Sequence, residues 1–234
     1  MTRQEVANGI MKTFGVVEKL QLLESFSQPE PLPVNEDFRK IILSEGNTYR
    51  DVYLAALNMS YHNIILSDFS FFQFSIEKQD HVRYAYYPNP FMSGSLEEKK
   101  RFRKYRELLE AELISQEDFE RMLVDTSHVS GVPMFRYENA PGQRVKFHHP
   151  CSHFHIGFHS ENRWPVERIL TPFAFSLLVL KQYHGISWRS HGDSEDDAHT
   201  GNIFDTNLIS EKYECRIIGP DFFEDIEKRS FFFG

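Results

Sequence analysis

Histidine residues are concentrated in one short segment, HHPCSHFHIGFH at 148–159, which holds five of the eleven histidines of the chain. Successive side chains of a β-strand point to opposite faces. His153, His155 and His159 therefore share one face, with neighbours spaced by roughly 6.6 Å, and Gly157 leaves room above them. The opposite face carries the apolar side chains Phe154, Ile156 and Phe158. This pattern predicts a site built on imidazole groups, and a solvated face of a half-exposed strand is the alternative.

One chemistry that fits this face needs no cofactor. His153 and His155 would act as general acid and base in phosphodiester cleavage, most simply of RNA, whose 2′-hydroxyl supplies the nucleophile. Arg168 or Arg163 would stabilise the charge that develops on phosphorus, and Tyr183 would donate a hydrogen bond. The predicted catalytic residues are therefore His153, His155, Arg168 and Tyr183.

A divalent metal ion is the second option, since His-x-His on a strand is a common pair of ligands. The ion would bind His153 and His155, and a third ligand would come from His149, His159, Cys151 or a distant carboxylate. The cofactor prediction is thus none, or one divalent metal ion.

Two nucleophilic mechanisms also use this segment. In single-strand DNA nickases a His-hydrophobic-His motif holds a metal ion while a tyrosine attacks phosphorus, and Tyr183 would be that tyrosine. Cys151 as a nucleophile is less favoured, because nothing nearby in the sequence orients a base toward it.

The segment KKRFRKYR at 99–106 concentrates positive charge on one predicted helix. Phe102 and Tyr105 share the expected core face, and basic residues cover the rest. These residues are predicted to contact nucleic acid phosphates: Lys99, Lys100, Arg101, Arg103, Lys104 and Arg106. The alternative is a solvated helix face whose charges pair with neighbouring glutamates at helical spacing.

Composition limits the classes of protein that this chain can be. It has 234 residues, with 41% hydrophobic and 26% charged residues, which is ordinary for a globular protein. A net charge of −8 argues against phosphate binding over the whole surface. Two cysteines cannot form a disulfide framework, and no apolar run approaches the roughly 20 residues of a membrane span. We expect a cytoplasmic protein with no membrane partner. The chain also lacks a phosphate-binding glycine loop and a G-x-S-x-G motif.

Hydrophobic periodicity predicts a single α+β domain over 1–234, with an antiparallel sheet and helices packed against it. The N-terminal part, to about residue 58, is predicted to be helical, with a break near Gly46. The predicted strands are 63–77, 82–88, 134–138, 145–149 and 152–160. Further helices are expected from Ser95 to about Ile114 and over 166–184, the second broken or restarted at Pro172.

One stretch of the chain resembles a known family. The residues are His149-Pro150-x-Ser152-His153-x-His155-x-Gly157, then Arg163-x-Pro165-Val166, Leu170-Thr171-Pro172-x-x-Phe175 and Tyr183. They resemble an uncharacterised bacterial family, domain of unknown function 2290. The resemblance implies no activity that can be transferred to a residue. Its implied setting is phage defence or a toxin-like system, by analogy with other small families.

The sequence thus predicts a phosphodiester-cleaving enzyme of the endoribonuclease type, acting in such a system through its His-x-His strand. The alternative is a non-catalytic interaction or sensor subunit of a multi-protein defence assembly. The partners would be nucleic acid in the first case and protein in the second.

Overall fold

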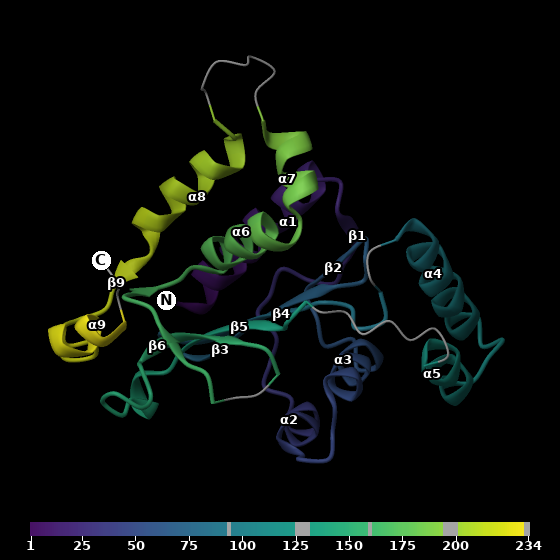
Figure 1. The fold of residues 1–234 in the computed structure, drawn as a ribbon, viewed down its shortest axis with the longest axis horizontal. Helices are drawn as coiled ribbons and strands as arrows, with labels where there is room; N and C mark the ends of the chain where they lie inside the picture. The colour runs from purple at the N-terminus through teal and green to yellow at the C-terminus, as the bar shows by residue number, and fades with distance from the viewer. Residues whose placement is uncertain (93–94, 125–131, 159–160, 194–200, 232–234) are drawn as a thin grey trace.

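A seven-stranded antiparallel sheet forms the centre of the molecule in a computed structural model (Figure 1). The structure describes residues 1–92, 95–124, 132–158, 161–193 and 201–231. Each strand pairs with the next in chain order: β1 Leu23–Phe26, β2 Ile64–Leu66, β3 Phe71–Lys78, β4 His81–Tyr87, β5 Phe135–Asn139, β6 Ser152–Ile156 and β7 Trp164–Pro165. With its helices, this sheet confirms the α+β class.

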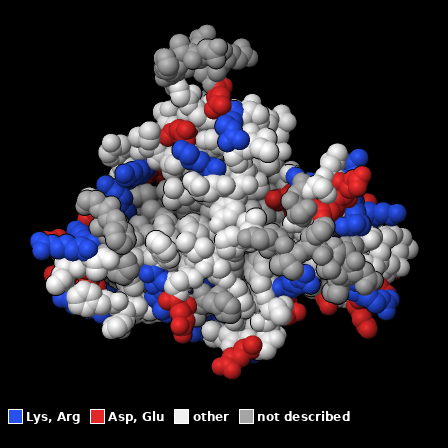
Figure 2. Space-filling model, viewed as in Figure 1, with Lys and Arg blue, Asp and Glu red and all other residues white. Residues whose placement is uncertain are grey.

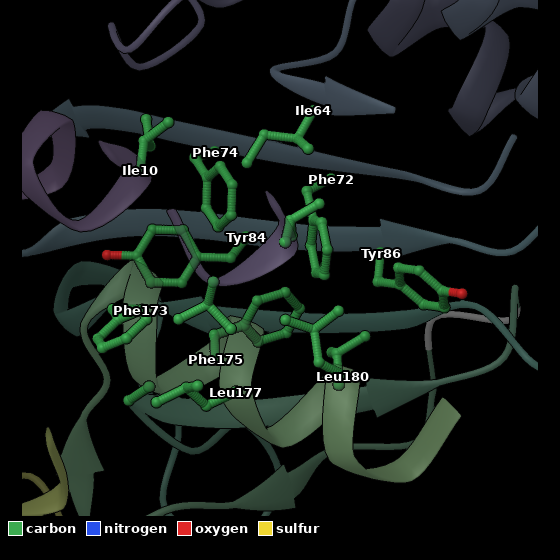
Figure 3. Close-up of a cluster of buried hydrophobic side chains, with 14 of the residues drawn as sticks. Ile10, Ile64, Phe72, Phe74, Tyr84, Tyr86, Phe173, Phe175, Leu177 and Leu180 are labelled. Carbon is green, nitrogen blue, oxygen red and sulfur yellow. The ribbon is translucent and has the colours of Figure 1, made fainter. Parts of the chain in front are cut away.

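Helices α1 (Arg3–Lys19) and α6 (Pro172–Tyr183) cover one face of the sheet (Figure 1). Phe72, Phe74 and Tyr84 project from β3 and β4 toward Phe175 of α6 (Figure 3). The Phe72 and Tyr84 rings lie 6.4 and 5.9 Å from the Phe175 ring. Phe72 and Phe74, which are even-numbered residues of the predicted strand 63–77, therefore point into the core beneath α6.

The other face is covered at one end by α2 (Glu36–Leu43) and α3 (Tyr49–Asn58), followed by α4 (Leu96–Glu110) and α5 (Gln116–Val124). The capping boxes Thr48/Asp51 and Ser95/Glu98 begin α3 and α4, as their spacing predicts. Phe71 and Tyr87 stack at 4.7 Å beneath α3 and form a second aromatic core. Beyond these helices the same face of the sheet carries polar side chains, and the candidate functional site lies there.

The C-terminal part adds a two-stranded sheet and three helices: β8 Arg168–Ile169, α7 Gly185–Gly192, α8 Ile203–Glu214, β9 Arg216–Ile217 and α9 Asp225–Phe231. A short 3₁₀ helix, Pro141–Gln143, follows β5. Among the described residues, no helix is long and apolar enough to cross a membrane.

Two predicted strands and two predicted helical segments differ from the structure. The predicted strand 63–77 is two strands, β2 and β3, because the chain turns between them with Phe69 at a positive φ of 61°. Residues 145–149 form no strand, only an isolated bridge between Val145 and His149. In the predicted helix 166–184, the restart at Pro172 is confirmed, with Thr171 as the cap, whereas the part before it is not helical and contains β8.

Strand β1 lies inside the N-terminal part that was predicted to be helical. Its pairing with β2 makes it the edge strand of the sheet. Helices α1 and α2, which flank it in the chain, pack on opposite faces. The first 58 residues therefore contribute to both layers of helices.

Candidate active site

Two rows of polar side chains cross the face of the sheet beyond α3. In one row Glu138 of β5 lies opposite Arg83 of β4 and His153 of β6. In the next row Arg136 lies opposite Ala85 and His155. Side chains on alternate residues of a strand share a face, so both rows lie on the side away from Tyr137 and Phe154. The register thus gathers two imidazoles, a carboxylate and two guanidinium groups.

The two predicted catalytic histidines are in direct contact. Nε2 of His153 lies 2.9 Å from Nε2 of His155, and both side chains are buried. Nδ1 of His153 lies 2.8 Å from the carbonyl oxygen of Pro150, which can only accept, so Nδ1 carries the proton. Nε2 of His153 is then a lone-pair donor that faces the second imidazole. The site has one ring whose tautomer is fixed by the backbone, as is usual for metal-binding histidines.

Glu138 completes a cluster of three groups that can hold a metal ion. One ligand atom from each of Glu138, His153 and His155 lies within 4.8 Å of the other two. Adjacent ligands of an octahedral ion, at about 2.1 Å from the metal, are about 3 Å apart, close to the separation of the two Nε2 atoms. Two histidines and one carboxylate form a common set of ligands for divalent iron, manganese or zinc. Of the third ligands considered from the sequence, a distant carboxylate is the one that this cluster contains, and it is Glu138.

Burial keeps both imidazoles neutral. It lowers the pKa of His153 to about 4, against the opposing effect of the Glu138 carboxylate. Burial and the positive charge of Arg136 lower the pKa of His155 to about 3. The pKa of Glu138 is also lowered, because the charge and hydrogen bond of Arg83, at 2.9 Å, outweigh burial. Neutral imidazoles beside an ionised carboxylate are the protonation states that a metal ion requires.

A cavity of about 300 Å³ lies over these rows, between them and α2. Four residues that line it have a buried side-chain nitrogen with no hydrogen-bond partner: Arg136 Nε, Arg163 Nε, His149 Nδ1 and His155 Nδ1. Outside this cavity, Nε1 of Trp188 is the only other buried side-chain nitrogen of the described residues that has no hydrogen-bond partner. A buried polar atom without a partner costs roughly 1–3 kcal/mol. Each of these atoms requires an explanation, and a polar ligand in the cavity is one that covers all four.

Arg168 and Tyr183 do not join the two histidines. Arg168 donates through Nη1 to the carbonyl oxygens of Lys212 and Cys215, at 3.2 and 2.8 Å. Tyr183 packs on Tyr86 and Phe135, in the core beneath α6. Both residues lie on the opposite side of the sheet from the cavity, because they follow β7 into the layer of α6. Of the two predicted arginines, it is Arg163 that lines the cavity.

The remaining residues of the histidine segment have different surroundings. His149 lines the cavity, with its ring 5.0 Å from that of His153, whereas His148 is exposed. Cys151 is buried, and burial raises its thiol pKa to about 11, which disfavours a nucleophilic thiolate. His159 lies outside the described residues.

The basic helix is separate from the cavity. None of its predicted contact residues lines it. Arg103 forms an ion pair with Glu24 of β1, and Arg106 pairs with Glu110 at 2.7 Å. Figure 2 shows acidic and basic side chains intermixed at the end of the molecule where α4 and α5 lie. This arrangement matches the alternative of a solvated helix face for those two arginines.

Another cavity, of about 420 Å³, lies between α1 and α8. Two of its charged residues pair with each other, since Glu211 accepts from Lys12 at 3.1 Å, and Glu211 also accepts from the Thr171 hydroxyl at 2.6 Å. The cavity over β5 and β6 is the better candidate, because four of its buried side-chain nitrogens have no such partners.

Sequence reasoning missed Glu138 and Arg136, although both stand on a strand that it predicted. The signal was the alternation in FRYEN, which puts Phe135, Tyr137 and Asn139 on one face and the two charged residues on the other. Only the pairing of β5 with β6 shows that this charged face continues the histidine face.

Comparison with known proteins supports one assignment. No curated protein and no solved structure matches the chain. The sequence model of one family, described as an uncharacterized conserved protein (DUF2290), matches residues 25–229, which include every strand from β2 to β9. The chain therefore belongs to the DUF2290 family.

Proposed function

We propose that this protein is a metal-dependent phosphodiesterase whose site is the cavity over β5 and β6. The observation that carries the proposal is the convergence of His153 Nε2 and His155 Nε2, at 2.9 Å, with the Glu138 carboxylate beside unpartnered arginine nitrogens. A metal-binding cluster beside guanidinium groups is suited to an anionic ester, because planar guanidinium groups bind phosphate oxygens in pairs.

Each residue has a distinct role in this proposal. Glu138, His153 and His155 would hold a divalent ion, and such an ion would supply a nucleophile near neutral pH by lowering the pKa of water. Arg136 and Arg163 bind the non-bridging phosphate oxygens and stabilise the charge that increases in the transition state. Arg83 holds Glu138 in place through its hydrogen bond.

The proposed reaction is hydrolysis. A water oxygen forms a bond to phosphorus, the bond from phosphorus to the leaving alcohol oxygen breaks, and one water proton passes to that oxygen. His149, with an unpartnered Nδ1 in the same cavity, is the side chain placed to carry this proton.

The metal-free alternative, with His153 and His155 as acid and base, has less support. A general acid must carry a proton at the working pH, and pKa values of about 4 and 3 leave both rings neutral. The two Nε2 atoms also face each other rather than separate positions on a substrate. Both features favour a shared ion over two independent proton-transfer groups.

The test combines metal content with turnover. The full chain, stripped with a chelator, is titrated with Mn²⁺, Zn²⁺ and Fe²⁺ under anaerobic conditions, and hydrolysis of bis(p-nitrophenyl) phosphate and of a labelled single-stranded RNA is measured. We expect one ion per chain and turnover that requires it. His155→Asn and Glu138→Gln should lose ion binding and turnover. His148→Asn, which changes an exposed histidine of the same segment, should keep ion binding and turnover.

Failure to bind any of these ions would overturn the proposal. Binding of an ion without turnover of either substrate would overturn its catalytic part, and would favour a non-catalytic subunit in a protein assembly. A setting in phage defence or a toxin-like system remains a prediction.

A further inference from the structure

The lining of the cavity over β5 and β6 changes character from one side to the other. The side formed by β5, β6 and the segment before β7 carries Arg136, Arg163, His149 and His155, together with the carboxylate of Glu138. The side formed by α2 and the residues before it is mostly apolar, with Leu32, Val34, Phe38, Ile42 and Leu43, and with Tyr61 beside Phe38. Its two polar members are Asn35 and Arg39. A ligand that fits both sides has an anionic group at one end and an apolar ring or chain at the other.

Two of these apolar residues are unusually exposed. Val34 is 55% exposed and Leu43 is 69% exposed, although both line a cavity. Phe38 and Tyr61 present aromatic rings, packed edge to face at 5.0 Å, on the same side. Aromatic and apolar walls of this kind bind the flat faces of nucleobases, and tolerate different bases.

The size of the cavity limits the ligand. A volume of about 300 Å³ is at the lower end of the range for small-molecule sites. It is suited to one nucleoside with its phosphate and is too small for a folded RNA or a duplex. Longer chains can enter only through one terminal unit.

We infer that the cavity binds a single nucleoside phosphate, with the phosphate at Arg136 and Arg163 and the base against Val34, Leu43 and Tyr61. This inference rests on the proposed function, because it names the substrate class of the same site. The unit is either a free nucleotide or the end of a single-stranded RNA, since both present the same chemistry.

The experiment measures binding to the full chain in the presence of a chelator, so that it does not depend on the metal ion. The probes are AMP, UMP, ribose 5-phosphate, inorganic phosphate and a five-nucleotide RNA with a 5′-phosphate. We expect AMP and UMP to bind at least tenfold more tightly than ribose 5-phosphate. An RNA that binds as tightly as the nucleotides indicates that one terminal unit enters the cavity, and an RNA that does not bind indicates a free nucleotide.

Variants separate the two ends of the ligand. Arg136→Gln should weaken AMP and ribose 5-phosphate alike, by at least tenfold. Val34→Ser combined with Leu43→Ser changes two exposed side chains, and should bring AMP to within threefold of ribose 5-phosphate without affecting the latter. Lys19→Gln, an exposed lysine at the end of α1, is the control for loss of one positive charge.

Equal affinity for AMP, ribose 5-phosphate and inorganic phosphate would overturn the nucleoside part of the inference, and so would tight binding of RNA without binding of nucleotides. If no probe binds but the ion still does, the inference fails while the metal site of the proposed function stands. If nucleotides bind and the ion does not, the inference about nucleotides stands while the metal site of the proposed function fails.

Discussion

Glu138 lies directly opposite His153 in the register between β5 and β6, and Arg83 lies opposite Glu138 from the other side. This row places a carboxylate between a guanidinium group and an imidazole. Arg83 donates to Oε1 of Glu138 at 2.9 Å and so holds the carboxylate from the side of β4. Its position beside the two histidines is therefore a property of the sheet and not of one flexible side chain.

The first prediction concerns stabilisation by metal. An ion that binds only the folded chain adds about 2.7 kcal/mol to the free energy of unfolding when its concentration is 100 times its Kd. We expect Mn²⁺ or Zn²⁺ to raise the Tm of the chelator-stripped protein in differential scanning calorimetry. His155→Asn should remove this increase, whereas His148→Asn should retain it. An equal increase in the His155→Asn variant would place the ion elsewhere.

The second prediction separates the arginine of the cavity from the arginine predicted from the sequence. Arg136→Gln should lower kcat/KM for a phosphodiester by about 100-fold, because it removes a donor that stabilises developing charge. Arg168→Gln should leave kcat/KM unchanged. It should instead lower the free energy of unfolding by about 1–3 kcal/mol, because two charge-assisted hydrogen bonds to backbone carbonyls are lost. Loss of activity in folded Arg168→Gln would contradict this assignment.

The third prediction concerns acid stability. Burial, helped by the charge of Arg106, lowers the pKa of His62 from 6.5 to about 4, and Ser27 lies 3.1 Å from its Nδ1. Below pH 6.5 the unfolded chain therefore takes up a proton at this residue that the folded chain does not, so stability decreases as the pH falls toward 4. The contribution to the loss is about 2 kcal/mol at pH 4.5.

Urea unfolding at pH 7 and pH 4.5 measures this loss. His62→Asn, which keeps a polar group toward Ser27, should lose less stability between the two pH values than the unmodified chain. Equal losses in the two proteins would show that His62 is not responsible.

The fourth prediction compares two glycines of the same helix. A Cβ on Gly9 would lie 2.9 Å from the ring of Pro172, so α1 and α6 approach closely at this point. A Cβ on Gly15 would meet no atom within 4 Å. Alanine in a helix interior is favoured over glycine by about 1 kcal/mol when space allows.

Gly15→Ala should therefore stabilise the protein by up to about 1 kcal/mol, and Gly9→Ala should destabilise it by about 1–3 kcal/mol through overpacking. Chemical denaturation of both variants checks the contrast. Stabilisation by both substitutions would mean that α1 and α6 can move apart without a decrease in the free energy of unfolding.

The sequence by itself determined the local elements whose signals lie within a few residues. The capping boxes at Thr48 and Ser95 fixed the starts of α3 and α4, because each box satisfies backbone groups within one turn. Alternation placed His153 and His155 on one face of a strand, since that periodicity is inherent in the backbone. It also identified the family to which the chain belongs, through residues 149–183.

Tertiary structure alone decided what stands beside those histidines. Glu138 and Arg136 reach them only through the pairing of β5 with β6, and register depends on contacts between residues far apart in the chain. Arg168 and Tyr183 lie away from this cluster, because the chain enters the layer of α6 before it reaches them. Proximity along the sequence predicted a site with those two residues, whereas the two faces of the sheet separate them from it.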